Sequence, residues 1–181
     1  FDRVPADGED TALTSNIIRS LRILADKAGI NGMIGGQVVD VISEDKGADE
    51  ITMDIIKFIH ENKTAAMIES SMMIGASLAG ATQPQIDIIE KTGSDIGLAF
   101  QIRDDILDIT GDGALLGKPI GSDERNGKAT YVSIAGLDKA KDDVRILSER
   151  AVGNLQSLPG SDADSGLFLK ELIEYLIDRD R

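Results

Sequence analysis

Apolar residues recur with a period of about 3.6 residues along most of the chain, which indicates amphipathic helices rather than strands. The first predicted helix lies within residues 11–29 and ends at Gly29, a common helix stop. Its apolar face consists of Leu13, Ile17, Leu21 and Leu24. The next stretch, INGMIGGQVVDVI, holds three glycines among apolar residues. Because glycine lowers helix propensity, these glycines indicate close helix packing or a ligand approached by the backbone.

Longer helical patterns follow in the middle of the chain. One begins at Asp49, a candidate N-cap, and continues to Ala81. Its second half is rich in small residues and methionine, as in a tightly packed central helix. Another pattern starts with Pro84 in its first turn and continues to Thr110.

The last third of the chain begins with residues 111–130, which are polar and too rich in glycine for regular structure. At least two further amphipathic helices are predicted, within residues 131–158 and 164–181. No stretch shows convincing strand alternation. The sequence therefore predicts an all-α fold, and 181 residues correspond to one domain.

A polar stripe crosses the apolar end of the helix predicted before residue 111. It consists of Gln101, Asp104, Asp105 and Asp108, which share one helix face. Like charges at such spacing cost about 0.2–0.5 kcal/mol per pair, and burial increases that cost. Carboxylate oxygens select Mg²⁺, Mn²⁺ or Ca²⁺, and Mg²⁺ suits a single helix because it keeps waters and binds substrate phosphate. A solvated acidic face is the alternative, although the neighbouring positions are apolar.

Basic residues follow the acidic stripe within the glycine-rich segment, at Lys118, Arg125 and Lys128. A phosphate bridged to Mg²⁺ needs Lys or Arg on its other side. The alternative is that these residues only aid solubility. In the stretch HENKT, Lys63 and Thr64 interrupt an otherwise apolar helix, so Lys63 either faces an anionic partner or extends to the rim.

Two smaller polar features complete the candidate chemistry. Gln37 and Asp40, three residues apart, form either an inward-facing functional pair or a hydrogen bond within the bundle. His60 is the only histidine, and its position in the helical pattern indicates a structural role.

Composition excludes several classes of protein. The formal charge of −13 leaves no basic stripe for nucleic acid. The sequence contains no run of 18 apolar residues, which is about the length that a membrane-spanning helix needs. The absence of cysteine excludes disulfides and thiolate metal sites, and it suits a cytoplasmic protein.

Five segments, spread in order over nearly the whole chain, resemble the trans-isoprenyl diphosphate synthases of the polyprenyl synthetase family. They are GINGMIGGQVVDV, HENKTAAMIESS, GLAFQIRDDILDITGD, LGKPIGSDERNGKATYVSIAGLDKA and YLIDRDR. FQIRDDILD is similar to the second aspartate-rich motif of the family, DDxxD. The resemblance implies the helical bundle of isoprenoid synthases.

The resemblance also implies a role for each candidate residue. Asp104 would bind Mg²⁺ directly, and Asp105 and Asp108 would bind it through water or as further ligands. The residues implied in catalysis are Lys63, Thr64, Gln101 and Lys118. Those implied in substrate binding are Gln37, Asp40, Lys63, Thr64, Phe100, Gln101, Lys118 and Lys128.

The implied reaction is an Mg²⁺-dependent condensation, with Mn²⁺ as a possible substitute. Isopentenyl diphosphate would be joined to dimethylallyl or geranyl diphosphate to give farnesyl diphosphate. Geranylgeranyl diphosphate is the alternative product. By the same resemblance we expect a homodimer. From the charge and the apolar pattern we expect neither nucleic acid nor membrane as a partner.

One departure from the family concerns its first DDxxD motif, which does not occur in this sequence. The opening FDRVPADGED resembles the part that follows that motif. We therefore expect residues 1–181 to be the C-terminal part of a single prenyl diphosphate synthase domain, and to be inactive alone. The alternatives are a non-catalytic subunit of a heteromeric synthase and a helical dimerisation or metal-binding protein.

Overall fold

The computed structural model describes residues 11–111, 128–161 and 163–178. These residues form helices and turns, without a strand, so the predicted all-α class is confirmed. None of the helices described is both long and apolar enough to cross a membrane. The elements are α1 (Thr11–Ala28), α2 (Met33–Glu44), η1 (Ala48–Glu50), α3 (Met53–Ile59), η2 (His60–Ala65), α4 (Ala66–Leu78), α5 (Gln83–Thr110), α8 (Tyr131–Ala135), α9 (Leu137–Gln156) and α10 (Asp164–Asp178).

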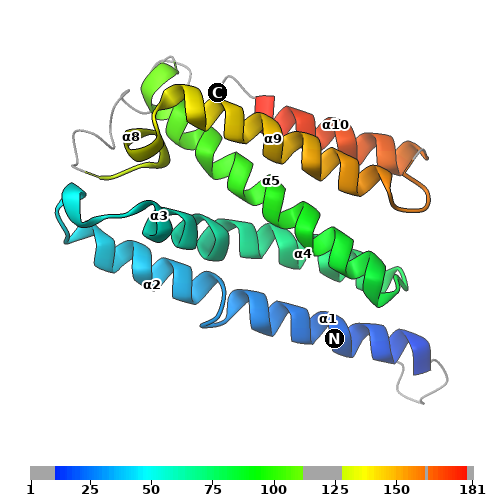
Figure 1. Ribbon diagram of the computed structural model, residues 1–181. Helices are drawn as coiled ribbons and strands as arrows, with labels where there is room; N and C mark the ends of the chain where they lie inside the picture. The colour runs from blue at the N-terminus through cyan, green and yellow to red at the C-terminus, as the bar shows by residue number, and fades with distance from the viewer. Residues whose placement is uncertain (1–10, 112–127, 162, 179–181) are drawn as a thin grey trace.

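The helices are arranged in successive layers around α5 (Figure 1). Helices α1 and α2 follow one another along one side, and the run α3–η2–α4 lies between them and α5. Helix α9 covers the opposite side of α5, and α10 packs on α9. Helix α5 is therefore in contact with both halves of the bundle.

Most predicted helix boundaries agree with the structure, with one exception. Helix α1 ends directly before Gly29, and Pro84 lies in the first turn of α5, as predicted. The prediction that Asp49 caps the central helix is wrong, because Asp49 lies in the short 3₁₀ turn η1. Ile51 is extended and buried in the core, which separates that turn from the helix. The N-cap is Thr52, whose hydroxyl accepts a hydrogen bond from the Ile55 N–H at 3.4 Å.

The main core lies between α5 and α9. The α5 residues are spaced as one helix face, and those of α9 repeat at three or four residues, as helical packing requires. They are Ile96, Ala99, Ile102 and Ile106 from α5 and Ala140, Val144, Leu147, Ala151 and Leu155 from α9. A second cluster joins α1, α4 and the start of α5 through Ile23, Met73, Ile86 and Ile89.

Glycines allow two helices, α2 and α5, to pack very close to η2. For α2, the glycine-rich stretch INGMIGGQVVDVI had predicted close helix packing. A Cβ on Gly36 of α2 would lie 2.4 Å from the backbone nitrogen of Lys63. A Cβ on Gly97 of α5 would lie 2.4 Å from the Cα atom of Ala65. The backbone of η2 is therefore held between α2 and α5 at positions where a larger residue would clash.

We predict that Gly97→Ala lowers the free energy of unfolding by about 1–3 kcal/mol, because its methyl group would overpack the contact with Ala65. Gly153→Ala is the matched control, since Gly153 is exposed in α9 and its added Cβ would contact nothing within 4 Å. That control should be neutral or stabilising by up to about 1 kcal/mol. Urea unfolding measures both variants, and an equal effect at the two positions would contradict the prediction.

Candidate functional site

The site is built around η2, a π-helical segment within the continuous helical run from α3 to α4. A π segment adds a residue to the local turn and is frequently found at functional sites. It carries Lys63 and Thr64, the two residues that the sequence singled out, and also His60. The sequence pattern gave no sign of this change in helix type.

Asp40 of α2 joins two lysines that are distant in the sequence. Its Oδ2 atom lies 2.6 Å from Lys63 Nζ, and its Oδ1 atom lies 3.1 Å from Lys128 Nζ. Burial by itself raises the pKa of Asp40, but the hydrogen bond from Lys63 and the charge of Lys128 outweigh it, so the pKa lies below its usual value. Asp40 is thus an ionised, buried acceptor that holds two cations side by side.

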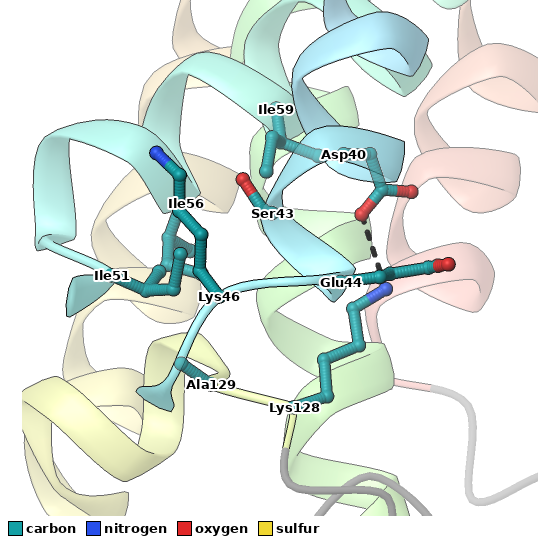
Figure 2. Close-up of a pocket in the computed structure, with 9 residues that line it drawn as sticks. All are labelled: Asp40, Ser43, Glu44, Lys46, Ile51, Ile56, Ile59, Lys128 and Ala129. Carbon is teal, nitrogen blue, oxygen red and sulfur yellow. Dashed lines mark hydrogen bonds and ion pairs between the residues drawn. The ribbon is translucent and has the colours of Figure 1, made fainter. Parts of the chain in front are cut away.

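A cavity of about 330 Å³ opens beside this ion pair. Figure 2 shows Lys128 extending toward the Asp40 carboxylate, with the side chains of Ile51 and Ile56 on the other side of the cavity. The lining residues are Asp40, Ser43, Glu44, Lys46, Ile51, Ile56, Ile59, Lys128 and Ala129.

A second, open groove of about 520 Å³ runs between α2 and the segment η2–α4. Its polar end contains Gln37, Lys63 and Thr64, and the Thr64 hydroxyl donates to Gln101 Oε1 at 3.1 Å. The rest of the groove is largely apolar. It is lined by Met33, Met67, Ile68, Ser71 and Met72. The structure therefore brings the predicted residues Gln37, Lys63, Thr64 and Gln101 to one place.

The acidic stripe of α5 is not a solvated face. Asp108 is only 2% exposed, and Asp104 and Asp105 are partly buried. Asp105 Oδ2 accepts a hydrogen bond from the backbone N–H of Tyr131 at 2.7 Å. The stripe continues along α5 from Gln101, so the acids follow the polar end of the groove.

Sequence reasoning missed two aromatic neighbours of the stripe. His60 is 7% exposed, and its Nε2 atom lies 3.9 Å from Asp105 Oδ2. Its ring stacks on Tyr131 with a centroid distance of 6.4 Å, and the Tyr131 hydroxyl donates to Asp143 at 2.9 Å. The only available signal was that His60 precedes Lys63 by three residues, which places both on one helix face.

The electrostatic surroundings keep both aromatic groups neutral. Burial, together with the charge of Lys128, lowers the pKa of His60 to about 4, against the opposing effects of Asp40 and Asp104. Burial and the hydrogen bond to Asp143 raise the pKa of Tyr131 to about 12.

The acidic stripe of α5 offers oxygen donors to a metal ion from one side only, because all of its carboxylates lie on a single helix. In residues 11–111, 128–161 and 163–178, no three His, Cys, Asp or Glu side chains gather closely enough to enclose a metal ion. The carboxylates of Asp104, Asp105 and Asp108 offer the oxygen ligands that Mg²⁺ prefers, and Mg²⁺ can complete its shell with waters and phosphate oxygens. Phe100 is half-buried on α5 beside Gln101. The predicted residue Lys118 and its neighbour Arg125 lie outside the described residues.

We predict that stability falls by about 2 kcal/mol between pH 7.5 and pH 5, because His60 is protonated in the unfolded chain but not in the folded one. The loss begins as the pH falls through the unfolded pKa of 6.5, and it continues down to the folded pKa of about 4. His60→Phe keeps a ring and removes the titration, so its stability should change less over the same range. Urea unfolding without Mg²⁺ measures the difference, and parallel curves for the two proteins would contradict the assignment.

Comparison with known proteins places the chain in a family. Residues 11–158 match the family model for polyprenyl synthetase. Farnesyl diphosphate synthase of Escherichia coli (strain K12) is 38% identical over 159 residues, which cover 87% of this chain and 52% of that protein. Geranylgeranyl pyrophosphate synthase 11, chloroplastic, of Arabidopsis thaliana is 36% identical over 163 residues, which cover 90% of this chain and 45% of that protein.

A solved structure agrees with these relatives. The geranyltransferase of Helicobacter pylori, complexed with magnesium and isoprenyl diphosphate, superposes with a TM-score of 0.69 at 28% identity, covering 91% of this chain and 52% of that one. The chain spans about half the length of the curated relatives it matches. With the family model matching most of its residues, the chain belongs to the polyprenyl synthetase family.

Proposed function

We propose that residues 1–181 supply the C-terminal part of the catalytic domain of an Mg²⁺-dependent prenyltransferase. It would join isopentenyl diphosphate to dimethylallyl or geranyl diphosphate and form farnesyl diphosphate. The observation that carries this proposal is the arrangement of Lys63 and Lys128 on Asp40, next to the acidic stripe of α5. Cations and carboxylates close together suit a diphosphate that carries its own divalent metal ions.

Each part of the site has a role in this reaction. Mg²⁺, when bound by Asp104, Asp105 and Asp108, supplies positive charge that neutralises the leaving pyrophosphate. Lys63 and Lys128 bind the diphosphate oxygens from the other side, and Lys118 is proposed to join them. The apolar part of the groove holds the allylic tail and excludes water, while Thr64 and Gln101 line its polar end with Gln37 and Phe100.

An assay of prenyl transfer and its product would distinguish two alternatives, a geranylgeranyl product and a non-catalytic role. The relatives include both farnesyl and geranylgeranyl synthases at similar identity, 38% and 36%, so a product assay has to decide between the two products. A non-catalytic subunit or dimerisation module is the runner-up. The ion-paired lysines and the buried acids support the enzyme instead, because cations and carboxylates gathered at one place suit a metal-bound diphosphate.

We also propose that the protein forms a homodimer through α1 and α2. This proposal is supported by a row of exposed apolar side chains on these two helices, which water would otherwise surround. They are Ile18, Leu21, Leu24, Ile34, Val38, Val41 and Ile42.

We predict that Leu21→Glu converts the dimer of the full-length gene product to a monomer, because a charge cannot be buried at an apolar interface without a partner. Ile146→Glu is the matched control, since Ile146 is equally exposed but lies on α9. Sedimentation equilibrium measures both variants. A dimer that survives Leu21→Glu would place the contact elsewhere.

The central test of the function is Asp104→Ala in the full-length gene product. We expect kcat for prenyl transfer to fall by about 100-fold or more, because one carboxylate of the metal site is lost. The melting temperature without Mg²⁺ should not fall, since a mutually repelling acid has been removed. Asp87→Ala, an exposed acid on the same helix, should keep normal turnover. Unchanged turnover in Asp104→Ala would exclude the assigned role.

Removal of metal gives a second test. We predict that Mg²⁺ together with a bisphosphonate, a stable mimic of diphosphate, raises the melting temperature of the full-length gene product. Binding to the folded state alone stabilises it by mass action. The same bisphosphonate with EDTA serves as the control, and an equal shift in both conditions would exclude a metal-mediated site.

A further inference from the structure

Asp105 is held by a backbone donor that comes from a distant element. Its Oδ2 atom accepts the N–H of Tyr131, the first residue of α8, at 2.7 Å. The first N–H groups of a helix have no partner within the helix, so this donor is available for a side chain. The bond fixes one oxygen of an acid that belongs to the proposed metal site.

His60 lies beside the same carboxylate, on the side of η2. Its imidazole is buried against the Tyr131 ring, and its Nε2 atom lies 3.9 Å from Asp105 Oδ2. The other nitrogen, Nδ1, is buried and has no hydrogen-bond partner among the residues that the structure describes. An unsatisfied buried nitrogen costs stability, so stability alone does not explain a histidine at this position.

Tyr131 is in turn fixed from α9. Its hydroxyl donates to Asp143 Oδ2 at 2.9 Å, and the other oxygen of Asp143 is paired with Lys139. A continuous series of contacts therefore leads from α9 through the Tyr131 side chain and backbone to Asp105.

We propose that His60 and Tyr131 are positioning residues that fix the orientation of Asp105 and thereby set the affinity of the acidic stripe for Mg²⁺. This inference rests on the proposed function. Partners that orient a metal ligand typically contribute about 10- to 100-fold in metal affinity. In this chain the Tyr131 N–H supplies the direct bond, and the His60 ring lies beside the same carboxylate, with its Nε2 atom 3.9 Å from Oδ2.

The geometry of Tyr131 allows its N–H to be removed selectively. Tyr131→Ala removes the ring and keeps the N–H, whereas Tyr131→Pro removes both. Proline is tolerated at the first position of a helix. The preceding residue, Thr130, already has the extended backbone that proline requires, with φ −121° and ψ 168°. The difference between the two variants therefore isolates the hydrogen bond to Asp105.

The role of His60 is separated in the same way. His60→Ala removes the ring, and His60→Phe replaces it with a ring of similar size. Asn62→Ala is the matched control, because Asn62 lies in the same π segment and donates to the Phe58 carbonyl instead.

The experiment measures the melting temperature of the full-length gene product as Mg²⁺ is titrated at constant inorganic pyrophosphate, and it reads the Mg²⁺ concentration at half-maximal stabilisation. We expect this midpoint to rise at least fivefold from Tyr131→Ala to Tyr131→Pro and about tenfold in His60→Ala. His60→Phe should restore it to within about twofold of wild type, and Asn62→Ala should leave it unchanged.

Equal midpoints in Tyr131→Ala and Tyr131→Pro, or a wild-type midpoint in His60→Ala, would overturn the inference while the metal site stands. No Mg²⁺-dependent stabilisation of the wild-type protein would overturn the metal site and the inference with it. Because melting temperatures in EDTA are recorded for each variant, a loss of fold is distinguished from a loss of metal affinity.

Discussion

The close approach of two helices to one π-helical segment determines how the rest of the site is arranged. Gly36 and Gly97 let α2 and α5 contact the backbone of η2, where any side chain beyond hydrogen would collide. Because the contact is made by backbone, small shifts are not absorbed by flexible side chains. Lys63 and Thr64 are thereby held at fixed positions relative to Asp40 on one helix and Gln101 on the other.

Away from the site, charged groups also join the layers. Lys27 of α1 pairs with Glu69 of α4 and lies 2.6 Å from Glu90 of α5. Arg150 of α9 donates to Asp95 of α5 at 2.7 Å, and a second contact makes this pair bidentate. Because partly buried carboxylates are costly without partners, these pairs tie the orientation of both outer layers to α5.

The features that were predicted correctly from the sequence are those that depend on local patterns of residues. The all-α class, the end of α1 before Gly29 and the first turn of α5 at Pro84 follow from periodicity and backbone preferences. The glycines of α2 predicted close packing before the partner was known. By contrast, Asp49 was wrongly predicted as an N-cap because the burial of Ile51, a tertiary contact, shifts the helix start to Thr52. The contacts of His60 with Tyr131 could not be predicted for the same reason, since they join segments about seventy residues apart.

In the proposed function, the pairing of two lysines with one buried carboxylate affects which anions can bind. Asp40 already holds the side chains of Lys63 and Lys128 in place, so these side chains lose little conformational entropy when they bind a ligand. In that proposal, the diphosphate has to displace Asp40 from the lysines, which a weakly charged anion would do poorly. Selection for highly charged ligands thus comes from a competitor that is part of the protein itself. Because Asp40 is buried, salt screens this competition less than it screens the exposed pair of Arg145 and Glu149 on α9.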